Sequence, residues 1–431
     1  MRIGIIIGRI GGVDGVARET QKWIEVLRSM GHRVFVLSGQ FQERSPEPDF
    51  ETLVPEMSFF SSESFWSQKR AFFYPETDPQ ELLDHILLGA GQICRHMLDW
   101  IESNRIEFLI SENASALPSQ LEMGQAIHMV VHSTGLPTIT HDHEFAWDRG
   151  SRYQSPLVEI QEFIDEIFPL RAPNSVHAVI NTNAADLLRE RFDRDSLLVP
   201  NVMDFSQPFG QKTPVHAPLA EALGFGPADM ILVQATRIMR RKGIHTAIEL
   251  LHRLEDNRVK LLITGNFTDD AGRAYHSEMM DAILDLGLGP RVRFAHEHFR
   301  VGPPPPGRSD SRHSLSDAYA LASGCTYFSS SEGFGNGFLE GILAKKPVFV
   351  NNYEPVFQTD IGSKGFRTVM IEHNQLTDEA VSDIARILSD PAEAKEIGEF
   401  NFELGKKHFG FDTLRGKLEL LLDRAQVAAG S

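Results

Sequence analysis

The sequence predicts an α/β protein with two Rossmann-like, doubly wound domains that face a cleft. One series of alternating apolar strand segments and helical segments starts at Ile3, and a second series starts at Met230. Such alternation favours parallel sheets covered by helices. A chain of 431 residues is also too long for one ordinary core, and a proline-rich polar stretch separates the two series.

The domain boundaries follow from that polar stretch, which carries four prolines and is typical of a linker. The last segment, Phe411 to Gln426, has leucines at helical spacing, so we expect a helix that packs back towards the first domain. The predicted parts are a first domain over 1–204, a linker over 205–228, a second domain over 229–410 and a C-terminal helix over 411–431.

The first domain opens with a strand at Ile3–Ile7 and a loop from Gly8 to Gly15 that holds four glycines. A helix is predicted over 16–30, Gly31 is well placed to end it, and the next strand is predicted at Val34–Leu37. Open α/β sheets bind ligands at the carboxyl ends of their strands. The glycine loop is therefore expected at a ligand-binding edge.

The remaining elements follow from apolar periodicity. Residues 41–80 show no apolar periodicity, so we expect them to form an irregular insertion over the active face. In the first domain we expect strands at Phe108–Ile110, Thr138–Thr140, Ala178–Ile180 and Leu197–Val199. We expect helices at Pro79–Asn104 and Ala184–Arg191, and a further helix that follows the Phe108–Ile110 strand and ends at Gly135. In the second we expect strands at Met230–Gln234, Val259–Thr264, Val292–Phe294 and Thr326–Ser329, helices at Gly243–Leu254, Ser316–Ser323 and Gly337–Ala344, and a stiff surface loop at Pro303–Pro306.

The composition disfavours several classes of protein. A formal net charge of −17 argues against nucleic acid, because Lys and Arg must neutralise its phosphates. Acidic residues outnumber basic ones in residues 1–200, which disfavours docking on anionic lipid and favours a small soluble ligand. No apolar run is long enough for a transmembrane helix. Cys94 and Cys325 are isolated, so we expect a reduced, cytoplasmic protein; a homodimer is left open.

A glycine-rich turn in the second domain is the strongest candidate site. Glu332 and Glu340, with seven residues between them, flank Gly333, Gly335 and Gly337, and a helix follows. Backbone N–H groups at a helix N-terminus bind phosphate. The first carboxylate can accept hydrogen bonds from sugar hydroxyls, and the second can reach a ribose diol. The plainer alternative is a strand-to-helix turn with a surface glutamate.

With its flanking residues this turn resembles the family-four glycosyltransferases, which carry Glu-Gly-Phe-Gly, a second glutamate and then Pro-Val. Arg237 and Lys242 match the family's arginine and the lysine five residues later, although a solvated helix start would also explain them. Pro200-Asn201-Val202-Met203-Asp204 resembles the inter-domain motif, with Val202 in place of glycine. Gly11 to Gly15 matches the first-domain glycine loop, which could also be a tight turn.

The resemblance implies a GT-B fold, with an acceptor-binding first domain and a nucleotide-sugar-binding second domain. It implies front-face, retaining transfer of a hexose, in which the departing diphosphate acts as base and the enzyme stabilises the charge that develops. The implied catalytic residues are His141, Arg237, Lys242 and Glu332. Donor-binding residues would be Gly12, Arg237, Lys242, Glu332, Gly333, Phe334, Gly335, Asn336, Gly337, Leu339 and Glu340. Acceptor-binding residues would be Gly11, Gly12, Asp14, His143, Arg149 and Arg152.

The donor is expected to be GDP-mannose or UDP-glucose, with no cofactor and no metal. Neither His141-Asp142-His143 nor His296-Glu297-His298 has a third ligand at recognisable spacing, and satisfied loop histidines are commoner. Arg149 and Arg152 favour an anionic acceptor such as a glycerate-type glycoside, as in compatible-solute synthases of this family, although an ordinary surface loop explains them equally well.

Three other functions remain open. A nucleotide-sugar epimerase or a lipid- or polysaccharide-directed glycosyltransferase would share the GT-B fold. A non-catalytic sugar-binding protein would keep the cleft but could lack Glu332 or Lys242, and both are present. A dinucleotide-dependent oxidoreductase is disfavoured, because Gly8 to Gly15 is not a GxGxxG loop.

Overall fold

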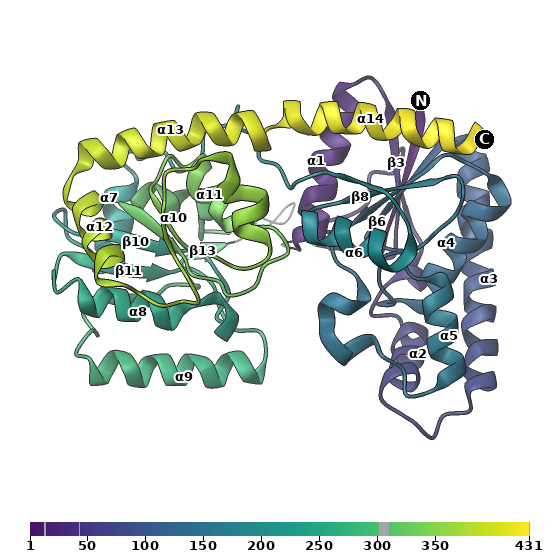
Figure 1. Ribbon diagram of the computed structural model, residues 1–431, viewed down its shortest axis with the longest axis horizontal. Coiled ribbons are helices and arrows are strands. Elements are labelled where there is room, and N and C mark those ends of the chain that lie inside the picture. Colours follow the sequence, from purple (N-terminus) through teal and green to yellow (C-terminus); the bar gives the residue numbers. More distant parts are fainter. Residues whose placement is uncertain (13, 43, 301–309, 431) are drawn as a thin grey trace. The chain divides into compact units, whose positions relative to one another are not determined.

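The structure is a computed structural model that describes residues 1–12, 14–42, 44–300 and 310–430. It divides into two compact units (Figure 1), of which unit 1 comprises Met1–Pro200 with Asp412–Ser431 and unit 2 comprises Asn201–Phe411. Each unit is built on one large parallel sheet with helices packed against it, so the predicted α/β architecture is confirmed. Pro303–Pro306, predicted as a surface loop, lies outside the described residues.

Unit 1 contains a seven-stranded parallel sheet in the order β5-β3-β1-β6-β7-β8-β9. Its strands are β1 (Arg2–Ile7), β3 (Arg33–Ser38), β5 (Glu51–Leu53), β6 (Phe108–Glu112), β7 (Thr138–Asp142), β8 (Ser175–Val179) and β9 (Ser196–Leu198). A short parallel pair, β2 (Ile10–Gly11) and β4 (Phe41–Gln42), lies beyond the ends of β1 and β3 in the chain. The strand order reverses direction between β1 and β6, which is where open α/β sheets bind ligands.

The helices of unit 1 are α1 (Gly15–Ser29), η1 (Pro55–Met57), α2 (Ser62–Phe72), α3 (Pro79–Asn104), α4 (Leu121–Thr134), η2 (Ala146–Tyr153), α5 (Val158–Ile167), α6 (Thr182–Phe192) and α14 (Phe411–Gly430). Helix α14 follows α13 in the chain but belongs to unit 1. Leu414, Leu418 and Leu421 are fully buried, and Arg415 donates a hydrogen bond to Ser29 Oγ of α1 at 2.9 Å.

The segment 41–80 is more regular than predicted. It contributes β5 to the edge of the sheet and forms helix α2, whose N-terminus is capped by the Ser61 side chain. The buried face of α2 includes Ser64 and Ser67 beside Ala71 and Phe72. Serines at inward positions erase the apolar periodicity of a helix, so the sequence pattern gave no sign of it.

Unit 2 contains a six-stranded parallel sheet in the order β12-β11-β10-β15-β16-β17. Its strands are β10 (Met230–Gln234), β11 (Val259–Ile263), β12 (Val292–Phe294), β15 (Gly324–Tyr327), β16 (Val348–Asn351) and β17 (Val369–Ile371), and β13 (Phe299–Arg300) pairs with β14 (His313–Ser314). Its helices are α7 (His216–Ala222), η3 (Arg240–Lys242), α8 (Ile244–Arg253), α9 (Asp270–Asp285), α10 (Leu315–Leu321), α11 (Asn336–Leu343), η4 (Phe357–Ile361), η5 (Gly362–Lys364), α12 (Asp378–Ser389) and α13 (Pro391–Phe409).

The stretch 205–228 was expected to be a linker, but it is part of unit 2 and contains helix α7. The backbone N–H of Gly210 donates to Ser316 Oγ at 2.8 Å, and the Phe209 ring lies 5.3 Å from that of Tyr319. Its prolines and polar residues resemble a linker in composition, but these contacts anchor the stretch to α10.

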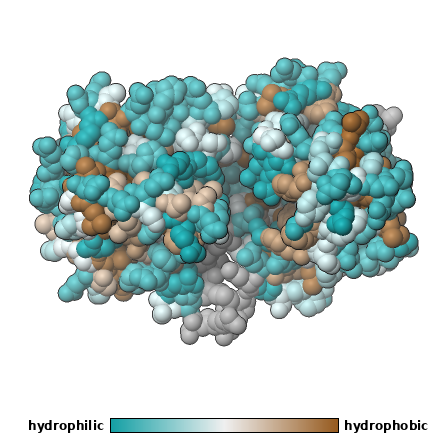
Figure 2. All heavy atoms as spheres, turned by 90° about the horizontal axis from the view of Figure 1, so that it is seen from below, coloured by the Kyte–Doolittle hydropathy of each residue, from teal (hydrophilic) through white to brown (hydrophobic). Residues whose placement is uncertain are grey.

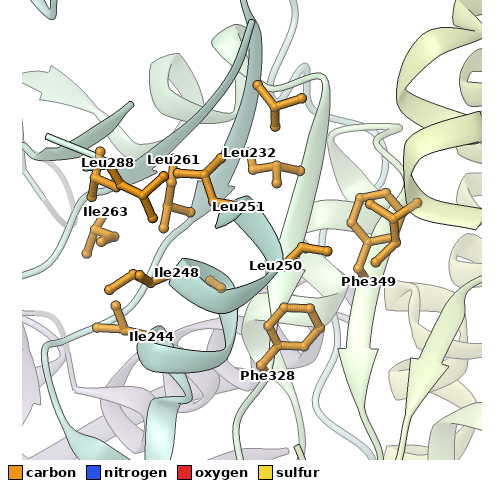
Figure 3. Close-up of a cluster of buried hydrophobic side chains, with 14 of the residues drawn as sticks. Leu232, Ile244, Ile248, Leu250, Leu251, Leu261, Ile263, Leu288, Phe328 and Phe349 are labelled. Carbon is orange, nitrogen blue, oxygen red and sulfur yellow. The ribbon is translucent and has the colours of Figure 1, made fainter. Parts of the chain in front are cut away.

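The core of unit 2 lies between the sheet and its helices. Figure 3 shows Ile244, Ile248 and Leu251 of α8 directed towards Leu232 of β10 and Leu261 of β11, and all five are at most 2% exposed. Each buried side chain of this size stabilises the fold by about 1.5–3 kcal/mol relative to exposure. This packing fixes the strand ends that carry the candidate site.

The face of the molecule drawn in Figure 2 is mainly hydrophilic. On the face in Figure 2, hydrophobic residues form small scattered groups among polar ones. In the described part of the chain, no helix is both long and apolar enough to cross a membrane.

Candidate active site

The predicted glycine turn of unit 2 lies between β15 and α11, and its shape requires glycine. Gly335 has a φ of +148°, and a Cβ there would lie 2.2 Å from the Tyr353 hydroxyl. That hydroxyl is buried and donates to the Phe334 carbonyl at 2.8 Å. At Gly337 a Cβ would lie 2.8 Å from the Tyr327 ring. The two tyrosines therefore pack so closely against the turn before α11 that they leave no room for a side chain at either glycine.

Lys242 and Glu332 meet beside this turn. The Lys242 Nζ forms an ion pair with Glu332 Oε1, and Arg241 Nη1 lies 3.2 Å from Glu332 Oε2. Burial lowers the pKa of Lys242, against the opposing effect of the Glu332 carboxylate. Burial acts to raise the pKa of Glu332, but the charges of Lys242 and Arg241 hold it below its usual value. The site thus contains a desolvated cation and an ionised carboxylate.

Arg237 supplies a second cation in the same segment, between β10 and η3. Its side chain is exposed, and it makes no ion pair or hydrogen bond with the part of the chain that the structure describes. Its positive charge helps to lower the pKa of Lys242. Gln234 holds the segment, because its Nε2 donates to the Lys242 carbonyl at 2.8 Å while its Oε1 accepts from Thr326 at 3.0 Å. These contacts orient Lys242 and leave Arg237 available to a ligand.

The second glutamate lies deeper than the first. Glu340 is 6% exposed, and its Oε2 accepts a hydrogen bond from the Tyr319 hydroxyl at 3.2 Å. Phe334 and Leu339 are buried, so their side chains belong to the core and only their backbone can serve a donor. Asn336 is held by Asn201, whose Nδ2 donates to Asn336 Oδ1 at 2.9 Å.

A hollow of unit 2 lies next to these residues. Its lining includes Thr236, Lys242, Tyr319, Ser329 and Gly337. Lys242 and Gly337 therefore line one hollow, and they are the two predicted donor-binding residues among its described lining.

Unit 1 carries a pocket of its own at the carboxyl ends of β1 and β6. Its lining comprises Ile7, Arg9, Asp14, Val16, Phe59, Glu112, Asn113, Leu117, Ser119, Glu144 and Tyr153. Of the predicted acceptor-binding residues, Asp14 is in the lining. It caps α1 by accepting from the backbone N–H of Val16 and Ala17, and it pairs with Arg9 at 2.8 Å.

The glycine loop packs against β4. Gly11 and Gly12 have φ values of +91° and +66°, and a Cβ on Gly11 would lie 2.5 Å from the Gln42 carbonyl oxygen. Gly11 therefore needs to be glycine for the close approach of β2 to β4, and at Gly12 the positive φ favours glycine.

His141 and His143 lie together at the end of β7, with a carboxylate that sequence reasoning missed. Glu112 of β6 is opposite His141 in the parallel register, and its Oε2 lies 2.9 Å from His141 Nδ1 and 3.9 Å from His143 Nε2. Burial, with the neighbouring His141 and Lys22, lowers the pKa of His143 well below its usual value. Only the strand order could have revealed Glu112, because it is 29 residues from His141.

These three residues can also hold a metal ion, because their ligand atoms lie within 4.8 Å of one another. Strand pairing places Glu112 beside the histidine pair as a third group, which no spacing in the sequence indicates. In the described part of the chain, His296 and His298 belong to no such cluster.

The two arginines predicted to bind an anion are placed differently. Arg149 forms two hydrogen bonds with Glu144, at 2.6 and 2.7 Å, so its charge is already neutralised. Arg152 is exposed. Neither is among the described residues that line the pocket of unit 1, where Arg9 is the cation. Arg9 precedes the glycine loop and carries no motif, so the sequence gave no signal for it.

This fold and the glycine-turn site define a class of protein. Residues 219–403 match the family model of glycosyl transferases group 1. The chain belongs to this glycosyltransferase family, because a relative shares 31% identity over nearly its full length.

Two relatives that match nearly the whole chain carry the same name. Mannosylglucosylglycerate synthase of Thermotoga maritima is 31% identical, with 96% of this chain and 98% of the relative covered. The synthase of the same name from Petrotoga mobilis is 27% identical, with 95% and 98% covered.

Solved structures show the fold. A Rickettsia africae glycosyltransferase superposes with a TM-score of 0.68 at 15% identity, covering 99% of this chain and 98% of that one. Anabaena HepE in complex with UDP and glucose gives 0.65 at 14% identity, with 98% and 100% covered. The GT-B fold implied by the sequence is confirmed.

Proposed function

We propose that this glycosyltransferase transfers a hexose, with retention, from a nucleotide diphosphate sugar to a small, soluble, anionic acceptor. The observation that carries the proposal is the Lys242–Glu332 pair beside the glycine turn that opens α11. In this proposal the enzyme works in the cytoplasm and associates with neither nucleic acid nor membrane.

Unit 2 would bind the diphosphate of the donor. Arg237 is exposed and Lys242 is desolvated, so together they offer two cations to a dianionic group. The backbone N–H groups of residues 333–337 at the start of α11 add donors that favour an anion. With two cations in place, we propose that the chemistry needs no metal.

The charges of the site suit front-face transfer. As the sugar–phosphate bond breaks, negative charge grows on the diphosphate and positive charge grows on the sugar ring. Arg237 and Lys242 would stabilise the first charge and Glu332 the second. The departing diphosphate would take the proton of the acceptor hydroxyl, so no carboxylate nucleophile is needed.

For the substrates we propose GDP-mannose as donor and a glycerate-type glycoside as acceptor, with UDP-glucose as the other donor to test. The names of the two synthase relatives support a mannosyl donor and an acceptor with a glycerate group. Arg9 lines the pocket of unit 1 and is paired with Asp14 at 2.8 Å, so it would bind the carboxylate by exchanging that partner.

A thermal-shift screen with GDP-, UDP- and ADP-sugars, followed by product analysis with the stabilising donor, tests this function. We expect GDP-mannose to stabilise the protein and to be consumed only when an acceptor is present. Consumption of a UDP-sugar without any acceptor would instead indicate an epimerase.

A further inference from the structure

Unit 1 has a second hollow, of about 180 Å³, between η2, α5 and α6, which is called the α5 hollow below. Tyr153 lines both this hollow and the pocket that contains Arg9, so the two share part of a wall. Pockets for drug-sized ligands measure about 300–1,000 Å³, so this smaller hollow suits a single ring. Its lining comprises Ala116, Ala146, Trp147, Gly150, Tyr153, Gln154, Gln161, Ile164, Asp165, Phe168, Arg191 and Phe192.

The α5 hollow has an apolar floor and a polar rim. Ala116, Ile164 and Phe168 are at most 4% exposed, whereas Asp165 and Arg191 are exposed to solvent. A pyranose ring is divided in the same way, because its C–H groups form apolar faces and its hydroxyls lie around the edge. Each hydroxyl can both donate and accept a hydrogen bond. The shape and chemistry of the hollow therefore match a sugar ring.

The rim carries one charge of each sign. Asp165 and Arg191 are the two charged residues in the described lining. An ion of either sign would meet one repulsive partner there, whereas a hydroxyl can donate to the carboxylate and accept from the guanidinium. Gln161 fixes the carboxylate, because its Nε2 donates to Asp165 Oδ1 and its Oε1 accepts from the Ser155 backbone N–H, both at 2.8 Å. The rim thus favours a neutral ligand.

Trp147 adds a fixed hydrogen-bond donor. The Phe145 ring stacks on its indole with centroids 4.5 Å apart, and the Arg191 guanidinium lies 4.7 Å from the ring centroid. The indole nitrogen is buried and forms no hydrogen bond in the described part of the chain. Trp23 and Trp100 also have buried indole nitrogens without such a bond, but neither lines this hollow. Trp147 is therefore the one beside which a ligand hydroxyl can accept the bond.

We propose that the α5 hollow is a sugar-binding site that takes one neutral pyranose ring, whose hydroxyls bind the Trp147 indole N–H and the Asp165 carboxylate. The site is separate from the donor hollow of unit 2. Since Tyr153 lines both hollows of unit 1, the bound ring lies beside the proposed acceptor pocket. This inference goes beyond the proposed function, because the site binds sugar without contacting the reacting atoms.

The indole signals of the full chain test the site without any transfer reaction. The chain has four tryptophans, and Trp147→Phe assigns the Trp147 signal in a ¹H–¹⁵N spectrum. Methyl α-D-glucopyranoside should shift this signal with a Kd of about 1–10 mM, as expected of a ligand with few contacts. The Trp23 and Trp100 signals should not move. Sorbitol, which has hydroxyls but no ring, should bind about fivefold more weakly or less, because an open chain must be ordered on binding.

Two variants of α5 provide a matched comparison. Asp165→Ala removes the rim carboxylate and should raise the Kd for the glucopyranoside by about tenfold, the effect of losing a hydrogen bond to a charged group. Glu162→Ala removes a carboxylate from the same helix, outside the described lining, and should leave the Kd unchanged. A Tm for each variant shows whether the fold is retained.

Four results would overturn the proposal. They are no shift of the Trp147 signal with the glucopyranoside, an equal Kd for folded Asp165→Ala and Glu162→Ala, a shift with sodium glycerate or inorganic phosphate alone, and loss of the shift in Arg9→Gln. The third result would indicate an anion site, and the fourth would place the sugar in the neighbouring pocket. Because the titration uses no donor, failure of this site leaves the proposed function standing, and failure of the proposed function leaves the titration interpretable.

Discussion

At the scale of single residues, the two glutamates of the glycine turn are expected to act differently. Glu332 is ion-paired with Lys242, whereas Glu340 is buried against Tyr319. Glu332→Gln removes the charge near the developing cationic sugar, so kcat should fall by about 10²- to 10³-fold. Glu340→Gln should mainly raise the donor KM, as expected of a group that binds ground and transition states equally.

Steady-state kinetics with varied donor distinguish the two variants. Because Glu340 is buried, a Tm for each variant is needed to separate binding from unfolding. The opposite pattern, or no effect of either substitution in folded protein, would mean that the donor does not lie along α11.

The pH dependence of the reaction should reflect the ionisation of Lys242. Burial lowers the pKa of this lysine below its ordinary value of 10.5, and only the protonated form can neutralise the diphosphate. Activity should therefore decline on the alkaline side at a pH below 10.5. In Lys242→Arg the guanidinium stays protonated, so the alkaline limb of kcat/KM should move to higher pH. An unchanged limb in a folded, active Lys242→Arg variant would show that another group controls it.

At the scale of elements, the turn before α11 should tolerate no side chain at Gly335. A Cβ there meets the Tyr353 hydroxyl at 2.2 Å, and the φ of +148° is unfavourable for other residues. Gly335→Ala should therefore destabilise the protein by about 1–3 kcal/mol or more.

The matched control for this prediction is Gly91→Ala in the middle of α3. No atom lies within 4 Å of a Cβ at that position, so alanine should stabilise the helix by about 0.5–1 kcal/mol. Urea denaturation of both variants measures the difference. Equal stability of Gly335→Ala and the wild type would contradict the described turn.

The sequence could predict elements whose inward face is apolar and whose ends carry clear signals. Helix α3 runs from Pro79 to Asn104 as predicted, with Asp78 as its N-cap, and β10 has its predicted bounds. Helix α2 was not predicted because serines on its inner face interrupt the apolar pattern, and α7 was not predicted because its segment is rich in proline.

Local motifs in the candidate site were likewise visible, but contacts across strands were not. The sequence identified Lys242 and Glu332, which the structure brings together. Glu112 could be recognised as part of the histidine cluster only from the pairing of β6 with β7. Arg149 forms an ion pair with Glu144, which the sequence did not indicate.

At the scale of the whole molecule, the central claim is retaining transfer driven by protein cations rather than by a metal. The most direct test is NMR of the product formed from GDP-mannose and a glycerate-type glycoside in excess EDTA. We expect an α-linked product from the α-configured donor, at a rate that EDTA does not change. A β-linked product, or a reaction that stops until Mg²⁺ or Mn²⁺ is restored, would contradict the account.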